Sequence, residues 1–290
     1  MTKLILFFVL FAASFYPTRP TQPESKSIAL CHSPAATDDM VFLASTAAFR
    51  ALHAEPLPFH FTSKAGGESI KFKAADGTEA GGFFLKAKSP SDKYLFVYQE
   101  WWGLNDYVKQ EAENYYNALG GKVNVLAPDL YDGKVTADRQ EAGKLIGAAM
   151  ANANHLEAIV KGAIGYAGSK AKIASVGWCF GGMWSLRSAL LEGKQAVGCV
   201  MYYGTPVKDV EQLKTLNTDV LGIFGSQDQG IPPATVEEFE KAMQAAGEKV
   251  TIKMFDAVHA FANPSNPKYD KAATAEAFAL SSGYLKKKLL

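Results

Sequence analysis

Cys179 lies in a stretch whose residues favour an abrupt change from strand to helix. Residues 172–176 are apolar and partly β-branched, which predicts a buried strand, whereas residues 183–191 space their apolar side chains as a helix does. The sulfur is therefore expected at the tip of a turn, exposed above a sheet and at a helix N-terminus, whose dipole favours a thiolate. Three flanking glycines allow such a turn without clashes of Cβ atoms: Gly177, Gly181 and Gly182.

A thiol of this kind needs partners, because only a few per cent of it is ionised at neutral pH when its pKa is unperturbed. Three other titratable residues also follow predicted strands: Glu100, Asp228 and His259. His259 is expected to take the thiol proton and to return it to a leaving group, while Asp228 holds the imidazole tautomer. The carboxyl ends of parallel strands meet at one edge of a sheet, so these side chains are expected to lie together.

Strands and helices alternate from about residue 94 onward, which predicts an α/β fold with a mostly parallel central sheet and helices on both faces. Before this region, residues 69–73 and 82–87 are predicted to form two strands joined through the turn signal Asp76-Gly77. Further strands are predicted at residues 94–98, 122–127, 196–203, 220–224 and 250–255, and helices at residues 107–119, 139–150, 155–168, 232–246 and 272–287.

The N-terminus has the features of a secretory signal peptide. Lys3 supplies a positive start, and residues 4–13 form an apolar run that is too short to span a bilayer. Small residues suitable for cleavage follow at Ala12-Ala13-Ser14. We therefore expect a signal peptide at residues 1–16, export to the periplasm or the medium, and no stable membrane insertion once the signal is removed. The alternative is that translation starts at Met40.

Residues 17–65 are interpreted as a linker or N-terminal extension, because three prolines and several Ser/Thr residues occur near their start. Residues 40–52 could form a short helix, although they lack a clear apolar stripe. The extension is expected to lead into, or pack against, a single domain at residues 66–290. No second domain is indicated.

Composition excludes several classes of partner. The chain has 290 residues, 48% of them hydrophobic, and 30 basic and 29 acidic residues give a net charge of +1. A net charge this close to zero gives no overall electrostatic attraction to nucleic acid or to an acidic membrane surface. The three cysteines (Cys31, Cys179 and Cys199) form no cluster with histidines at zinc-ligand spacing, and Cys31-His32 is at most half a site. We expect neither a metal nor a cofactor.

Several segments together resemble the dienelactone hydrolase family, and the elbow around Cys179 resembles that of α/β-hydrolases with cysteine in place of serine. The resemblance covers about residues 66–290. It implies that Cys179 is the nucleophile, His259 the base and Asp228 its orienting acid, and that Glu100 approaches the sulfur and takes part in its activation. The segments are Gln99-Glu100-Trp101-Trp102-Gly103, Ala127-Pro128-Asp129-Leu130-Tyr131, Gly177-Trp178-Cys179-Phe180-Gly181-Gly182, Tyr202-Tyr203-Gly204 and His259-Ala260-Phe261.

The oxyanion hole is expected to consist of the backbone N–H groups of Phe180 and Trp101. Dienelactone-cleaving members carry an arginine shortly after the histidine, and this sequence has Asn263 there. A second arginine of those members could correspond to Arg139 in this sequence. Losing one bidentate carboxylate clamp argues against dienelactone itself as the substrate. Aromatic side chains are expected to line the substrate pocket: Trp101, Trp102 and Trp178.

These observations predict a carboxymethylenebutenolidase-like hydrolase of a small-molecule ester or lactone, in which Cys179 forms an acyl-enzyme that water then cleaves. The alternative is a non-hydrolytic thiol sensor or binding module on the same fold. A redox oxidoreductase ranks last, because no resolving cysteine lies near Cys179 in the sequence.

Overall fold

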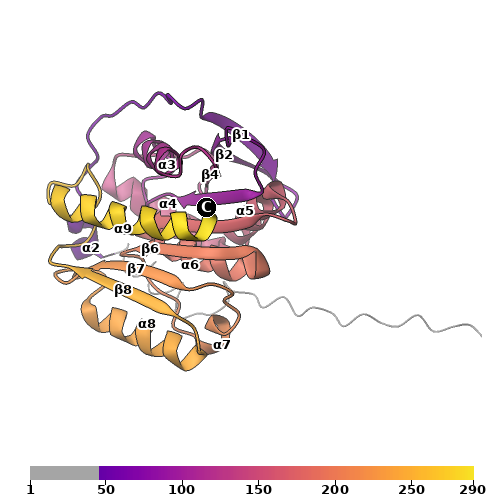
Figure 1. Cartoon of the computed structure of the whole chain (residues 1–290). Coiled ribbons are helices and arrows are strands. Elements are labelled where there is room, and N and C mark those ends of the chain that lie inside the picture. The colour runs from indigo at the N-terminus through magenta and orange to yellow at the C-terminus, as the bar shows by residue number, and fades with distance from the viewer. Residues whose placement is uncertain (1–45) are drawn as a thin grey trace, which may run out of the picture.

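The computed structural model describes residues 46–290, so the predicted signal peptide at residues 1–16 and Cys31 lie outside the described residues. An eight-stranded sheet with the order β1-β2-β4-β3-β5-β6-β7-β8 forms the centre of the described part. The hairpin β1–β2 and strand β8 lie at opposite edges of this sheet (Figure 1). The strands are β1 Glu68–Lys73, β2 Glu79–Leu85, β3 Lys93–Tyr98, β4 Asn124–Pro128, β5 Lys172–Trp178, β6 Ala196–Tyr202, β7 Val220–Gly225 and β8 Val250–Phe255.

Strand β2 pairs antiparallel with β1 and with β4. The strands in the sheet order β4-β3-β5-β6-β7-β8 pair parallel with one another. This confirms the predicted mostly parallel α/β fold. Most helices begin and end within a few residues of the predicted ones, while the short α7 was not predicted. The helices are α2 Ala47–Leu52, α3 Asp106–Ala118, α4 Arg139–Ala151, α5 Ala153–Ala167, α6 Phe180–Glu192, α7 Val210–Leu213, α8 Pro233–Ala246 and α9 Lys271–Leu289.

Helices α6 and α9 cover opposite faces of the sheet. The Tyr202 hydroxyl, at the end of β6, donates to Ser281 of α9 at 2.8 Å. Cys199 of the same strand contacts Ser185 of α6 at 3.5 Å. Side chains three apart on a strand point to opposite faces, so the central strands are buried between two layers of helices. Among the described residues, no helix is both long enough and apolar enough to cross a membrane.

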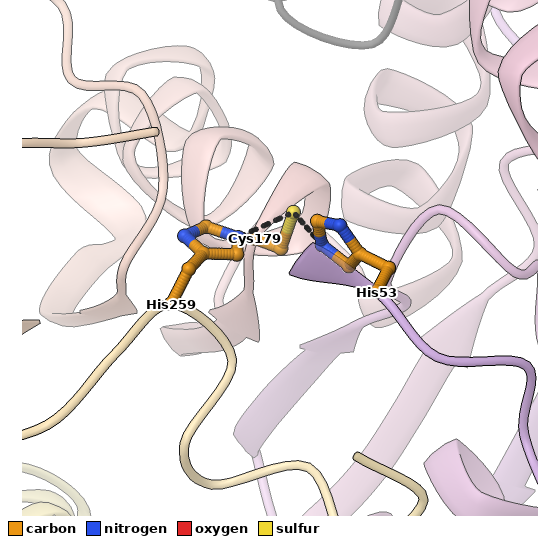
Figure 2. A group of neighbouring side chains, drawn as sticks. All are labelled: His53, Cys179 and His259. Carbon is orange, nitrogen blue, oxygen red and sulfur yellow. Dashed lines mark hydrogen bonds between the residues drawn. The ribbon is translucent and has the colours of Figure 1, made fainter. Parts of the chain in front are cut away.

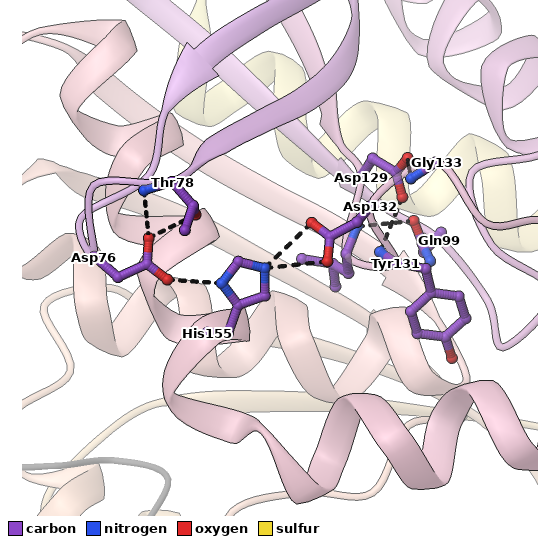
Figure 3. A network of polar contacts seen from close by, with 9 residues as sticks. Asp76, Thr78, Gln99, Asp129, Tyr131, Asp132, Gly133 and His155 are labelled. Carbon is purple, nitrogen blue, oxygen red and sulfur yellow. Dashed lines mark hydrogen bonds and ion pairs between the residues drawn. The ribbon is translucent and has the colours of Figure 1, made fainter.

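Polar contacts fix the loops at the carboxyl edge of the sheet (Figure 3). Gln99, directly after β3, accepts a backbone N–H bond from the loop that follows β4, at 3.1 Å. Asp129 accepts two further backbone N–H bonds from that loop. His155 of α5 bonds Asp76 at 2.7 Å and Asp132 at 3.1 Å, and the Asp76 carboxylate raises the pKa of His155. These contacts give the Pro128-Asp129 segment a structural role in holding the loop.

The parallel strands bring four predicted site residues to one edge. Glu100 follows β3, Cys179 follows β5, Asp228 follows β7 and His259 follows β8. The strands that carry the first two, β3 and β5, are direct neighbours in the sheet. The predicted convergence of these loops is therefore a direct consequence of strand order.

The close packing of the elbow generates a stability prediction for Gly181→Ala. A Cβ atom at Gly181 would lie 2.2 Å from the backbone oxygen of Tyr98 and 2.5 Å from that of Gln99. Since both clashes are with backbone atoms, which cannot move aside as the end of a flexible side chain can, we expect a loss of about 1–3 kcal/mol or more in the free energy of unfolding. Gly165→Ala, in helix α5 where a Cβ meets nothing within 4 Å, should gain up to about 1 kcal/mol. Urea unfolding of both variants checks this, and equal stabilities would contradict it.

Candidate active site

The chain turns from β5 into α6 at Cys179 in a conformation that side chains rarely adopt. Its φ is 54° and its ψ is −114°. Hydrogen bonds on both sides hold it there, because its N–H donates to the Tyr202 oxygen at 3.0 Å and its oxygen accepts from the Met183 N–H at 3.1 Å. Gly177, Gly181 and Gly182 have no positive φ, and a Cβ atom at any of them would clash with neighbouring backbone. These glycines therefore allow close packing, whereas the strained backbone conformation is that of the cysteine itself.

The structure brings His259 and Asp228 into line with the sulfur. Nε2 of His259 lies 3.4 Å from Sγ of Cys179, and its Nδ1 lies 2.6 Å from Oδ2 of Asp228. The other Asp228 oxygen accepts the N–H groups of Gly230 at 2.7 Å and Ile231 at 2.9 Å. The carboxylate is thus immobilised, and it fixes the orientation of the imidazole.

Burial determines the protonation of the thiol. It raises the pKa of Cys179, and the nearby Glu100 adds to this, while His259 and the Phe180 N–H act in the opposite direction. The resting group is therefore a thiol, and the expected effect of the helix N-terminus is outweighed by desolvation. Burial also lowers the pKa of His259, but the charges of Asp228 and Cys179 and the hydrogen bonds to both residues together outweigh this and hold that pKa well above its usual value.

Glu100 is also buried, but its hydrogen bonds are not to Cys179, His259 or Asp228. One oxygen accepts from the Tyr203 hydroxyl at 3.5 Å and the other from the Asn263 amide at 2.5 Å. Burial raises the pKa of Glu100 to about 7. In the described chain no hydrogen bond joins Glu100 to the sulfur, so its predicted approach to Cys179 stays a prediction. Asn263, at the position where an arginine is expected, serves as its partner.

The predicted exposure of the sulfur is wrong, because Cys179 is only 2% exposed. Helix α2, which comes from the predicted linker, covers the sulfur; its N-cap is Thr46, whose side chain accepts the N–H of Phe49. The Phe49 ring lies 5.5 Å from that of His259, and the His53 ring lies 4.5 Å from that of Trp101. The extension therefore packs against the domain, directly over the nucleophile.

His53 is the residue that the sequence did not indicate. Its Nδ1 donates to the Phe49 oxygen at 2.9 Å, and its Nε2 lies 3.8 Å from the Cys179 sulfur. Figure 2 shows the sulfur between the rings of His53 and His259. Burial and the nearby His259 lower the pKa of His53 to about 3, so its ring is neutral. No motif or periodicity in its segment could have identified it.

A small cleft adjoins Glu100. Its wall includes Trp102 and Trp178, whose predicted contact with substrate stays a prediction, whereas Trp101 packs on His53. Arg139 does not line this cleft, and its guanidinium lies 3.8 Å from Glu55 instead. The lining residues are Glu100, Trp102, Asn105, Tyr107, Val108, Glu111, Trp178, Ala262, Asn263, Pro264 and Ser265.

Comparisons with known proteins agree with this architecture. The model of the dienelactone hydrolase family matches residues 81–289. The chain belongs to the dienelactone hydrolase family. This confirms the predicted family and its class, hydrolases acting on ester or lactone bonds.

Individual relatives are distant. The "Protein usf" of Aquifex pyrophilus is 25% identical over 77% of this chain and 99% of its own length. "Carboxymethylenebutenolidase 1" of Cupriavidus pinatubonensis is 22% identical over 73% of this chain and 93% of its own. A putative dienelactone hydrolase structure from Klebsiella pneumoniae has a TM-score of 0.63 and 20% identity, covering 76% of this chain and 98% of that one. That structure supports the fold.

The cover over the nucleophile generates a reactivity prediction. Phe49→Ala should increase the rate at which a small alkylating reagent modifies Cys179, because the removed ring packs on His53, Trp101 and His259. Peptide mass mapping measures modification at Cys179 alone. Phe59→Ala is the matched control, since Phe59 stacks on Tyr107. Equal rates in wild type and Phe49→Ala would show that α2 does not limit access.

Proposed function

We propose that this family member hydrolyses neutral carboxylic esters or lactones with Cys179 as nucleophile, His259 as base and Asp228 as the orienting acid. One observation carries the proposal: a buried, continuous line of contacts runs from Sγ through both nitrogens of one imidazole to a carboxylate. This is the arrangement by which a weak nucleophile is activated. It supports a hydrolase more strongly than any single residue does.

In the first half-reaction, His259 Nε2 takes the thiol proton as Sγ attacks the carbonyl carbon. The N–H groups of Phe180 and Trp101 stabilise the oxyanion of the tetrahedral intermediate. The bond from carbon to the leaving oxygen then breaks, and His259 returns the proton to that oxygen. A thioester remains on Cys179. Water, deprotonated by His259, attacks the thioester, and the acid and the free thiol are released.

Glu100 supports the resting state of this cycle. A nearby carboxylate disfavours a thiolate, and Glu100 is one of the groups that raise the pKa of Cys179. To accept the thiol proton directly, its side chain must leave the amide of Asn263 and the hydroxyl of Tyr203. Glu100 is therefore proposed to keep the thiol protonated until substrate enters.

The cleft favours an uncharged substrate. No lysine or arginine is among its lining residues, whereas two glutamates are, Glu100 and Glu111. Burial raises the pKa of each to about 7, so both gain negative charge as the pH rises. A substrate carboxylate would have no cationic partner there and would meet like charges. The wall formed by Trp102 and Trp178 suits an apolar or aromatic group.

A thiol sensor is less well supported. Sensor cysteines are exposed and have a depressed pKa, whereas Cys179 is buried and its pKa is raised. Export of the enzyme remains part of the proposal, supported by the apolar run at residues 4–13.

Removal of either reacting group should abolish turnover. Cys179→Ala and His259→Ala are expected to lower kcat for a neutral aryl ester by about 10³-fold or more, because attack needs both thiol and base. The control is Cys199→Ala, which removes a buried thiol of β6 that contacts Ser185 of α6, and it should retain activity. Steady-state kinetics with the neutral ester tests the roles of Cys179 and His259, and comparison with its carboxylate-bearing analogue tests the preference for an uncharged substrate. Full activity of Cys179→Ala would contradict the mechanism, and preference for the anion would contradict the substrate class.

The pH profile should follow His259. A base must be neutral to accept a proton, and Asp228 together with Cys179 holds the pKa of His259 well above 6.5 against the opposing effect of burial. We therefore expect kcat/KM to rise with pH, with its half-maximal value above pH 6.5. Asp228→Asn removes the raising charge, so the midpoint should move to lower pH while kcat falls by as much as about 10⁴-fold. A wild-type midpoint below pH 6.5, or no shift in the variant, would contradict this assignment.

A further inference from the structure

Two imidazoles face the sulfur of Cys179, although hydrolysis needs only one. Nε2 of His259 lies 3.4 Å from Sγ and Nε2 of His53 lies 3.8 Å from it. All three side chains are buried, and their donor atoms lie within 4.8 Å of one another. Figure 2 shows the two rings on either side of the sulfur. Nitrogen, nitrogen and sulfur form a donor set that zinc prefers in proteins.

The hydrogen bonds of the two rings leave both of these nitrogens free to act as ligands. Nδ1 of His53 donates to the Phe49 backbone oxygen, and Nδ1 of His259 donates to the Asp228 carboxylate. Nε2 of each ring therefore faces the same sulfur, and it carries a free lone pair whenever that ring is neutral. Metal-binding histidines are typically fixed in this way, with the second nitrogen donating to a carbonyl or a carboxylate.

We propose that Cys179, His53 and His259 bind one Zn²⁺ ion. Bonds of about 2.3 Å to sulfur and about 2.05 Å to nitrogen at tetrahedral angles place a sulfur and a nitrogen ligand about 3.5 Å apart. The two observed S···N separations, 3.4 and 3.8 Å, lie on either side of this value. Binding displaces the proton of the thiol and, where His259 is protonated, the proton on its Nε2; these protons are released to solvent, and the fourth position is left open to water.

Zinc binding has two consequences beyond the proposed hydrolysis. The metal engages the lone pair of the nucleophile and the nitrogen of the base, so it blocks attack on a substrate. It also joins His53 of the N-terminal extension to two residues of the domain, and so fastens α2 over the site. Zinc would thus act as a reversible inhibitor that also holds α2 in place over the site.

Equilibrium binding tests the site without any turnover. Wild type should bind one Zn²⁺ in competition with a chromogenic chelator, and His53→Ala should bind it at least about tenfold more weakly. His60→Ala is the matched control, because His60 is exposed and bonds Asp106 instead. Equal affinity of wild type and His53→Ala would overturn the proposal. Circular dichroism shows whether each variant is folded.

Cobalt gives a second readout that does not depend on the stability of His53→Ala. Co²⁺ bound to wild type should show a thiolate-to-cobalt charge-transfer band, and Cys179→Ser should lack it while Cys31→Ser retains it. A band that survives Cys179→Ser would place the metal elsewhere and overturn the proposal. If zinc binds as expected but no ester or lactone is cleaved, the site stands and the proposed hydrolysis fails.

Discussion

The whole site depends on the strained backbone of Cys179. Its positive φ carries a cost of order 1–3 kcal/mol, and the structure sustains it through backbone hydrogen bonds to Tyr202 and Met183. The same turn brings α6 close enough to β3 that Gly181 has no room for a side chain. Sheet and helix thus hold the sulfur at one point, and the loops after β7 and β8 bring acid and base to it. Small residues at the elbow are a condition of this geometry.

Burial then determines how that sulfur behaves. A desolvated thiol keeps its proton, so activation requires a base whose own orientation is fixed, and Asp228 provides this for His259. Glu100 occupies the same dry region and is held by Asn263. The charge balance around the nucleophile is therefore set by side chains from four loops, and a substrate that adds a further negative charge has no partner in the adjoining cleft.

Local patterns were sufficient to predict much of this arrangement. The glycine spacing around Cys179 predicted the elbow, and the alternation of strands and helices predicted the parallel sheet, which in turn brings Asp228 and His259 to the same edge. The cover could not be predicted, since His53 meets Cys179 across 126 residues of chain and its segment has no periodic signal. For the same reason the sulfur was expected to be exposed. The role of Asn263 also depends on a contact with Glu100 that sequence spacing does not encode.

Trapping the acyl group tests the central claim most directly. A neutral aryl carbamate transfers a carbamoyl group that leaves a nucleophile slowly, so its adduct accumulates long enough for peptide mass mapping. The account predicts one carbamoyl group on the peptide that contains Cys179, with release of one equivalent of phenol and loss of esterase activity in proportion. Inactivation with the group on any other residue, or steady ester turnover by enzyme whose Cys179 is fully carbamoylated, would contradict it.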